Sequence, residues 1–590
     1  MEAKPESLAA GGAAAPDGSD YAVQTIKHLA ALSSSLERLK FLQAKSQPTL
    51  PSEQLRKKSL HQITDYILAR VENLHAPLLI VVGGSTGAGK STLVNSLLGE
   101  TISPSGAVRP TTRMPVLAYN PADESWFASQ RILTALKRLK FSGVKTDGAL
   151  STEPAVQLAP HPKIPQGIAM IDAPDVDSIS DENRALAVQL LNAADLWLFV
   201  TTANRYADAL PWDLLTEAGA RDITVNIVLN RVPAGAEVEI LPDLERLLAE
   251  RNLGSSAVHV IHETVLGQDR LLVPELVDPI SNWLISLAGD AKERRRIAAQ
   301  TLDGALKRTL ADVNELYAEV QDQEVQLNEL MLAVDQRFDG AMDEVKLALK
   351  DGSLLRGEIL ARWQDFVGAG ELLRGLEGRV GRIRDRIGSF FSGKPPSSHR
   401  VEEAIQAGLH SIFVAEITSA VQDLDRSWRN TPIGLELRSE LPAPRPSEDL
   451  DVQASTAVRE WQKDVLSMIR EEGAGKRKTA RMAAFGVNGI AVILMIVVFA
   501  STAGLTGLEL GIAGGSAVIG QKLLEAIFGE DAVRRMATKA NGMLEERARA
   551  LIESNAEPYR MAIRHHQQPD EVQSLAEFIR SQGGKGVTNE

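Results

Sequence analysis

The stretch Gly84-Ser85-Thr86-Gly87-Ala88-Gly89-Lys90-Ser91 fits the pattern G-x-x-x-x-G-K-[ST], which is typical of loops that bind phosphate groups. Before it, Leu78-Leu79-Ile80-Val81-Val82 has the composition of a buried strand, and after it residues 92–98 have that of a helix. A Gly-rich turn between a strand and a helix N-terminus presents backbone N–H groups and the positive end of the helix dipole to an anion. The stretch therefore predicts that residues Gly84 to Ser91, together with Thr92, contact phosphate.

Two side chains of this stretch have specific predicted roles. Lys90 would pair with the β- and γ-phosphates of a nucleotide, and the hydroxyl of Ser91 would bind Mg²⁺. We therefore expect a nucleoside triphosphate and Mg²⁺ as cofactors.

The composition limits the class of protein. A chain of 590 residues is too long for one hydrophobic core, and 44% hydrophobic with 24% charged residues is typical of folded domains. The net charge of −13 and the 4% of aromatic residues argue against a general nucleic-acid-binding protein, so we expect no nucleic-acid partner. The absence of cysteine excludes disulfides, thiolate metal ligands and cysteine nucleophiles.

The chain before residue 76 has two parts. Residues 1–20 are rich in Ala, Gly and Pro and lack the basic start and apolar core of a signal peptide, so we expect a disordered tail. In residues 21–75, apolar positions at three- and four-residue steps and a break between Pro48 and Pro51 predict N-terminal helices. These helices either pack on the domain that follows them or belong to a more distant helical stalk.

Residues 76–288 alternate apolar, strand-like runs with helical segments, which is typical of a doubly wound parallel sheet. The predicted strands are 78–82, 116–119, 167–171, 196–201, 224–229 and 257–261. Ligands of such sheets bind beyond the carboxyl ends of the strands. Asp172 lies at that end of the third predicted strand and could hold Mg²⁺ through water. The alternative for Asp172 is a helix or turn cap.

These motifs resemble those of the dynamin-like large GTPases, especially the bacterial membrane-associated members. Thr112-Arg113-Met114-Pro115 is similar to the family's T-x-x-P motif, and Asp172-Ala173-Pro174-Asp175 is similar to its D-x-P-G motif. The resemblance implies a P-loop GTPase domain with GTP and Mg²⁺. It implies Lys90 and Thr112 as catalytic residues, and Ser91, Thr112 and Asp172 as the metal site. Without the resemblance, two adjacent threonines in a loop indicate only turn chemistry.

The chain departs from the family at positions that are linked to hydrolysis. Asp175 stands where the family has a Gly whose backbone N–H approaches the γ-phosphate, and a carboxylate there adds repulsion. Thr86 and Gly87 correspond to the hydrolysis-linked Gln and Ser of the dynamin P-loop. We therefore expect GTP hydrolysis that is slow or stimulated by a partner.

The guanine-reading motif is incomplete. Asn230-Arg231-Val232-Pro233 occupies the place of the family's [TN]-K-x-D motif. Asn230 can hydrogen-bond the base and the stem of Arg231 can lie along it. Pro233 cannot replace the Asp whose carboxylate accepts two hydrogen bonds from guanine. GTP is therefore the nucleotide expected by resemblance, and the sequence does not exclude ATP.

Residues 289–480 are expected to form a helical stalk. From about residue 290 to 350 apolar residues keep a helical period, which predicts a helix of about 60 residues and roughly 90 Å. Helices at about 401–430 and 451–472 would bundle with it. Within this region, residues 354–394 combine Phe390 and Phe391 with arginines beside an apolar stripe. This pattern is typical of a membrane-facing tip, and buried packing with a solvated basic face is the alternative.

Residues 481–528 contain the predicted membrane segment. Met482 to Leu508 includes no charged residue and is long enough to cross the hydrocarbon core of a bilayer, which is about 30 Å thick. A shorter Gly-rich apolar stretch follows Glu509, and basic residues flank both ends, so we predict a transmembrane hairpin with both flanks in the cytoplasm. A hairpin buried in the bundle is the alternative. Residues 529–580 would be C-terminal helices and 581–590 a tail.

The expected fold class is α/β plus all-α: a doubly wound P-loop GTPase domain, a long helical bundle or stalk and a transmembrane hairpin. The leading hypothesis is a multi-pass protein of the cell inner membrane with its nucleotide domain in the cytoplasm. It would couple GTP binding and hydrolysis to stalk movement and to membrane remodelling or maintenance. Its partners would be the lipid membrane and a homo- or hetero-oligomer formed through G domains and stalk. The alternative is a nucleotide-gated membrane scaffold that hydrolyses little and recruits partner proteins.

Overall fold

The computed structural model describes the chain with gaps. The described residues are 18–42, 51–104, 114–129, 132–133, 136–141, 154–178, 180–350, 397–441, 449–474 and 528–583. The predicted membrane-facing tip at 354–394 lies outside them, and so does the predicted transmembrane hairpin at 481–528 except for Phe528. Within the described ranges, no helix is both long and apolar enough to cross a bilayer. The transmembrane hairpin therefore stays a prediction.

The chain divides into two compact units. The first comprises Met1–Phe41, Thr49–Gln321 and Gln568–Glu590, and the second comprises Leu42–Pro48 and Asp322–Gln567. The α/β part and the helical remainder that the sequence predicted are thereby confirmed as classes of structure.

The first unit is built on an eight-stranded sheet in the order β3-β4-β2-β5-β1-β6-β7-β8. The strands in chain order are β1 (Leu78–Gly84), β2 (Val116–Tyr119), β3 (Lys137–Lys140), β4 (Ala155–Pro160), β5 (Ile168–Asp172), β6 (Leu196–Thr202), β7 (Thr224–Val232) and β8 (Val258–His262). Strand β1 is buried along its whole length and pairs in parallel with β5 on one side and β6 on the other. This arrangement puts the loop after β1 beside the carboxyl ends of both neighbours.

The sheet differs from the predicted one in two respects. All the predicted strands appear, as β1, β2, β5, β6, β7 and β8, but β3 and β4 were not predicted. In addition, β2 pairs with β5 in antiparallel and with β4 in parallel, so the sheet is mixed rather than parallel throughout. Residues 161–167, which join β4 to β5, are too few for the crossover that parallel strands require, so β5 runs opposite to β4. Because β2 is parallel to β4, β5 is antiparallel to β2 as well.

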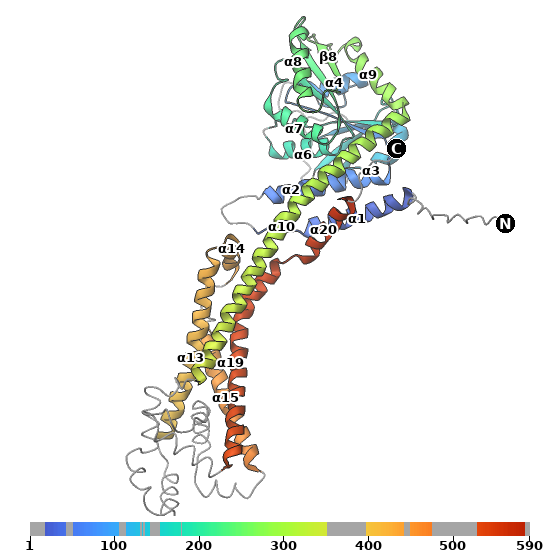
Figure 1. The fold of residues 1–590 in the computed structure, drawn as a ribbon. Coiled ribbons are helices and arrows are strands. Elements are labelled where there is room, and N and C mark those ends of the chain that lie inside the picture. The colour runs from blue at the N-terminus through green and yellow to red at the C-terminus, as the bar shows by residue number, and fades with distance from the viewer. Residues whose placement is uncertain are drawn as a thin grey trace, which may run out of the picture. The chain divides into compact units, whose positions relative to one another are not determined.

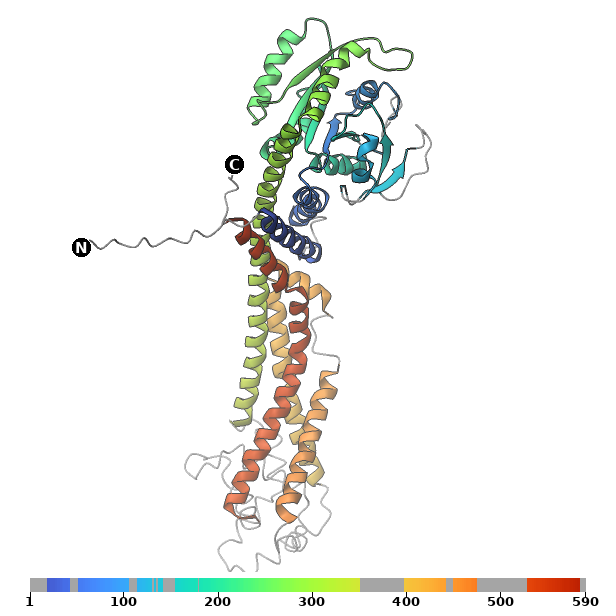
Figure 2. The same ribbon diagram turned by 90° about the vertical axis from the view of Figure 1, so that its right-hand side faces the viewer.

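Helices cover both faces of the sheet (Figures 1 and 2). One face packs against α4 (Lys90–Leu98) and α9 (Pro274–Gly289). The other face packs against α6 (Asp181–Asn192), α7 (Ala209–Ala220) and α8 (Glu237–Ala249). Alternate residues of β1 belong to these two cores, as the pleat of a strand covered on both faces requires. Short helices η2 (Pro121–Asp123) and α5 (Glu124–Phe127) follow β2.

The helices before β1 belong to the same unit as the sheet. They are α1 (Gly18–Arg38), α2 (Pro51–Gln62), the π-helical turn η1 (Ile63–Ile67) and α3 (Leu68–Glu72). They share a hydrophobic core with the first part of α10 (Ala291–Lys350) and with α20 (Pro569–Gly583). Gln62 also donates to the carbonyl of Asn192 over 3.2 Å. These helices therefore belong to the unit that contains the sheet, and they also pack on α10, whose residues the sequence assigned to the stalk.

Asp195 is a buried carboxylate just before β6 that joins three elements. Its Oδ1 accepts a hydrogen bond from Tyr66 over 3.0 Å, its Oδ2 accepts one from the N–H of Leu79 over 2.7 Å, and it forms a buried ion pair with Arg70. Burial raises the pKa of Tyr66 well above its ordinary value, and the charge of Asp195 raises it further. This cluster fixes the start of β1 against η1 and α3.

The second unit is a bundle of long helices. With the later part of α10, its members are α13 (Ser397–Trp428), α14 (Pro432–Glu440), α15 (Leu450–Ala474) and α19 (Glu530–His566). Helix α10 is continuous over 60 residues, as its apolar period predicted. In the core, Trp461 donates to the carbonyl of Ala540 over 2.9 Å and so ties α15 to α19.

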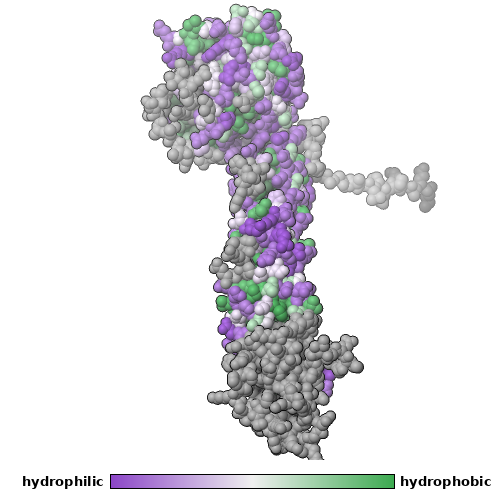
Figure 3. Space-filling model, turned by 90° about the vertical axis from the view of Figure 1, so that its left-hand side faces the viewer, coloured by the Kyte–Doolittle hydropathy of each residue, from purple (hydrophilic) through white to green (hydrophobic). Residues whose placement is uncertain are grey.

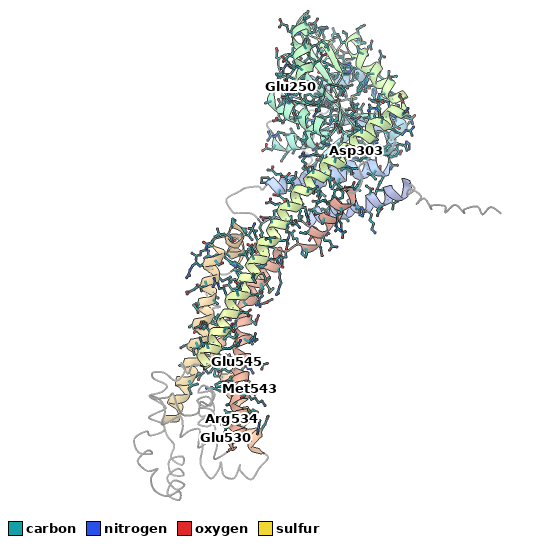
Figure 4. The ribbon with its side chains drawn as sticks, viewed as in Figure 1. Glu250, Asp303, Glu530, Arg534, Met543 and Glu545 are labelled. Carbon is teal, nitrogen blue, oxygen red and sulfur yellow. The ribbon has the colours of Figure 1, made fainter. Side chains whose placement is uncertain are left out.

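Figure 3 shows one face of the molecule, coloured by hydropathy. In the view of Figure 3 hydrophilic residues predominate and hydrophobic ones form small patches. Figure 4 shows Glu530 and Arg534 in the first turns of α19, where Arg534 donates to Glu530 over 2.8 Å. Exposed pairs at this spacing contribute only about 0.3–0.5 kcal/mol each, so the apolar core rather than the surface holds the bundle together.

We expect Asp195→Asn to destabilise the first unit. The substitution leaves the guanidinium of Arg70 buried without its counter-charge, and removal of one partner of such a pair costs about 3–5 kcal/mol. Hydrogen–deuterium exchange of the β1 amides measures this loss of stability as faster exchange. The method suits a chain of more than one domain because it reports the opening of each region separately. Asp243→Asn, which removes an exposed carboxylate paired with Arg246, is the control and should leave β1 protection unchanged. Equal protection of β1 in wild type and Asp195→Asn would contradict the assignment.

Candidate functional site

The loop after β1 has the backbone conformation of an anion cradle. Gly84, Gly87 and Gly89 have positive φ angles of 145°, 75° and 100°, which side chains disfavour. A Cβ at Gly84 would overlap the backbone carbonyl of Val200, and one at Gly89 would overlap the side-chain amide of Asn230. Gly84 and Gly89 are therefore required by the close approach of β6 and β7 as well as by the turn itself.

Lys90 is buried at the first residue of α4. Its ammonium donates to the carbonyls of Gly84 over 2.9 Å and Ser85 over 3.1 Å, and it forms an ion pair with Asp175. The N-terminus of a helix carries a positive partial charge, so a buried cation there needs a nearby anion. In this structure the carboxylate of Asp175 supplies that negative charge.

Asp172 ends β5 and is fully buried. Its Oδ2 accepts hydrogen bonds from the hydroxyl of Ser91 over 2.6 Å and from the hydroxyl of Ser103. Burial raises the pKa of Asp172, while the two hydroxyls and the charge of Lys90 act in the opposite direction. Ser103 is positioned by Asn95, whose side chain bonds both its N–H and its carbonyl.

These residues fit a Mg²⁺ ion held through water. Oδ1 of Asp172 is buried and has no hydrogen-bond partner among the described residues, so it can accept from a metal-bound water. The hydroxyl of Ser91 lies against the other oxygen of the same carboxylate. No group of three or more His, Asp or Glu side chains in the described ranges could hold a metal on its own. That donor set suits Mg²⁺, which binds few protein ligands and keeps waters and phosphate oxygens.

A second polar cluster surrounds Thr86. Oδ1 of Asp177 accepts from both the N–H and the hydroxyl of Thr86, each over 2.6 Å. Arg205, after β6, donates to the carbonyl of Thr86 over 2.9 Å and to Oδ2 of Asp177 over 2.8 Å, and it also pairs with Asp208. Burial raises the pKa of Asp177, but the bonds from Thr86 and Arg205 outweigh it and leave the pKa below its ordinary value. Every polar group of Thr86 is thus engaged.

Asn230 connects β7 to the phosphate loop. Its side-chain Nδ2 donates to the carbonyl of Ala88 over 2.8 Å, and its Oδ1 accepts from the N–H of Arg231 over 2.9 Å. Arg231 has an exposed side chain and a positive φ of 56°. Pro233 follows at the end of β7 and offers no donor or acceptor from its side chain.

The structure brings most of the predicted site residues together. Residues Gly84 to Thr92 form the loop and first turn, and Lys90, Ser91 and Asp172 surround its base. Thr112 lies outside the described residues. Sequence reasoning missed Ser103, Asp177 and Arg205, because a single Ser, Asp or Arg in a loop carries no motif. It noticed Asp175 as a departure but did not predict that Asp175 would contact Lys90.

Part of the chain is similar in sequence to known proteins. Residues 80–231 match the sequence model of the dynamin family. The chain is 28% identical over 139 residues to a probable transmembrane GTPase, FZO-like and chloroplastic, from Arabidopsis thaliana. That match covers 24% of this chain, and this chain spans only 13% of the length of that relative.

Solved structures also align with the chain. A chain of an oligomerised bacterial dynamin pair aligns over 95% of this chain and 99% of its own, at 10% identity and a TM-score of 0.39. The bacterial dynamin GTPase LeoA from ETEC aligns over 96% of this chain and 95% of its own, at 14% identity and a TM-score of 0.23. At these scores the fold of this chain rests on its own sheet topology rather than on the alignments.

We expect Gly89→Ala to lower nucleotide affinity more than tenfold, because the added Cβ meets the amide of Asn230 and the residue has a positive φ. Gly235→Ala is the matched control: Gly235 also has a positive φ, of 84°, but no heavy atom lies within 4 Å of an added Cβ. That control should lower the free energy of unfolding by about 1–2 kcal/mol and leave nucleotide affinity unchanged. Titration with a fluorescent nucleotide measures the affinity of both variants. Equal affinities of Gly89→Ala and Gly235→Ala would contradict the close approach of Asn230 to Gly89.

We expect Ser103→Ala to raise the Mg²⁺ concentration needed for half-maximal nucleotide binding by about tenfold. The substitution removes one of the two hydroxyls that orient the carboxylate of Asp172. Ser129→Ala, at the end of α5, is the control, because the hydroxyl of Ser129 donates only to nearby backbone carbonyls. Identical Mg²⁺ titrations for Ser103→Ala and wild type would contradict a role of Ser103 in orienting Asp172 for Mg²⁺ binding.

Proposed function

We propose that this chain, whose residues 80–231 match the dynamin family, is a membrane-anchored dynamin-like GTPase that uses GTP and Mg²⁺. Lys90 would bind the β- and γ-phosphates, and the loop from Gly84 to Thr92 would surround the phosphates. Ser91 and Asp172 would hold Mg²⁺ together with Thr112 of the T-x-x-P motif. Asn230 and Arg231 would contact the base. Lys90 and Thr112 would carry the catalytic charge stabilisation.

The single observation that carries this proposal is the cluster at the carboxyl edge of the sheet. The buried ammonium of Lys90 and the hydroxyl of Ser91 come from α4, the carboxylate of Asp172 comes from β5, and the three converge beneath the glycine-rich loop that follows β1. The unpartnered oxygen of Asp172 gives the cluster a polar atom that lacks a bond within the described chain. Phosphate with Mg²⁺ satisfies both the cation and this oxygen.

The membrane part of the proposal rests on the sequence. The apolar stretch in residues 481–528 and its basic flanks support a hairpin in the inner membrane, with the nucleotide domain in the cytoplasm. The relative from Arabidopsis is itself described as a transmembrane GTPase, which agrees with a membrane-bound role. Copies or paralogues would pair through their G domains and helical stalks, and the stalk would transmit the nucleotide state to the bilayer.

A second candidate is a nucleotide-gated scaffold that hydrolyses little and recruits partner proteins to the membrane. The contact between Asp175 and Lys90 favours it, because a carboxylate already neutralises the lysine that hydrolysis requires. Pro233 at the place of the guanine-reading Asp also leaves ATP as a possible ligand.

Turnover of the full chain with GTP and with ATP, in the presence and absence of anionic liposomes, tests the two candidates. We expect GTP turnover that rises with liposomes and falls at least about 100-fold in Lys90→Ala, because the phosphates lose their buried cation. Lys307→Ala, an exposed lysine paired with Asp303, is the control and should keep wild-type turnover. Tight binding with no turnover under any of these conditions would reject the enzyme in favour of the scaffold.

A further inference from the structure

The segment after β5, residues 173–178, is attached to the phosphate loop at several points. The N–H of Ala173 donates to the carbonyl of Val82 over 3.2 Å, and that of Val176 donates to the carbonyl of Gly84 over 3.4 Å. Asp177 binds Thr86 through two hydrogen bonds of 2.6 Å. Asp175 therefore lies between fixed neighbours on both sides, and its position over Lys90 is part of the local fold.

The ammonium of Lys90 has no spare donor in this arrangement. An ammonium group has three N–H donors, and the acceptors here are the carbonyls of Gly84 and Ser85 and the carboxylate of Asp175. Asp175 is the one charged acceptor of the three. A phosphate oxygen can bind Lys90 most readily by replacing it, because the two carbonyls belong to the loop that forms the cradle.

We propose that Asp175 is an internal competitor of the terminal phosphate, so that the chain binds nucleoside diphosphate in preference to triphosphate until the segment 173–178 releases Lys90. The proposal rests on the proposed function, since it assumes that nucleotide phosphates bind this loop. It assigns to Asp175 the control of which nucleotide state the site holds.

The preference for diphosphate follows from charge. The α- and β-phosphates are held chiefly by backbone N–H groups of the loop, which Asp175 does not occupy. A terminal phosphate needs the ammonium of Lys90 and brings further negative charge beside the carboxylate that is bound to it. The side chain of Lys90 is only 4% exposed and that of Asp175 is 20% exposed, so solvent screens charges at this position only in part.

Release of Asp175 has a structural consequence. The residues that attach the segment to the loop follow Asp175 directly: Val176 bonds to Gly84 and Asp177 bonds to Thr86. Displacement of Asp175 by a terminal phosphate would therefore disturb both attachments. Arg205 donates to the carbonyl of Thr86 and to the carboxylate of Asp177, so a shift of the segment would also move the loop after β6. Replacement of Asp175 at Lys90 would thereby change the position of Arg205, whose side chain is 38% exposed at the surface of the first unit.

Affinity measurements with GDP and a non-hydrolysable GTP analogue, and with the corresponding adenine nucleotides, test this on the full chain. Asp175→Asn keeps the shape of the side chain and removes its charge. We expect the triphosphate to bind at least about tenfold more tightly than to wild type, with less than about threefold change for the diphosphate. Asp181→Asn, an exposed carboxylate in the first turn of α6, removes the same charge nearby and should leave the ratio unchanged.

Different outcomes separate this inference from the function on which it rests. Binding of both nucleotides with an unchanged ratio in Asp175→Asn would overturn the inference and leave the GTPase proposal in place. Absence of binding for guanine and adenine nucleotides in wild type and both variants would overturn the proposed function and the inference with it.

A second test uses wild type alone and so does not depend on the folding of a variant. Hydrogen–deuterium exchange of residues 173–178 should rise when the triphosphate analogue is added and stay constant with diphosphate, because only the former displaces Asp175. Equal protection in the two complexes would overturn the inference.

Discussion

A buried ammonium at a helix N-terminus is the constraint on which the nucleotide site depends. Lys90 lies where the helix dipole is positive and where water is excluded, so the fold is stable only when negative charge or carbonyl dipoles surround its Nζ. Gly84 and Ser85 supply the dipoles and Asp175 supplies the charge. The loop can turn back over Lys90 in this way because its glycines accept positive φ angles. This demand for an anion is met by Asp175 in the structure, and it is the demand that a nucleotide phosphate would meet in the proposed function.

The central position of β1 makes this arrangement rigid at both ends. At its start, the N–H of Leu79 bonds to Asp195, which is itself paired with Arg70. At its end, Gly84 lies against the backbone of Val200 in β6. The cradle therefore has little freedom to move toward or away from a ligand. The segment 173–178 is held by hydrogen bonds and ion pairs with groups that a nucleotide also seeks, so it is the part of the site that ligand chemistry can displace.

The sequence predicted the parts of this structure that depend on local pattern. The phosphate loop, the buried strands, the 60-residue helix α10 and the resemblance to dynamins, now confirmed for residues 80–231, all follow from spacing, periodicity or contiguous motifs. It did not predict β3, an exposed Lys-Arg-Leu-Lys edge strand, or β4, because neither has the apolar run that marks a central strand. The roles of Ser103, Asp177 and Arg205 depend on contacts between residues 69 to 119 positions apart. Such contacts leave no trace in a single sequence.

Helix α10 contacts the sheet of the first unit at the edge opposite Lys90. The hydroxyl of Thr301 donates to the carbonyl of Asp195 over 3.0 Å, and Gln300 donates to the carbonyl of Asp222 over 2.9 Å. Gly304 packs directly on the backbone of Arg221, where any side chain would overlap it. These contacts fix the first turns of α10 to the amino ends of β6 and β7, opposite the nucleotide edge of the same strands. A tilt of β6 or β7 that begins at their carboxyl ends would therefore reach residues 300–304 of α10 through these contacts. Within the first unit, the strands themselves join the edge that carries Lys90 to the edge that contacts α10.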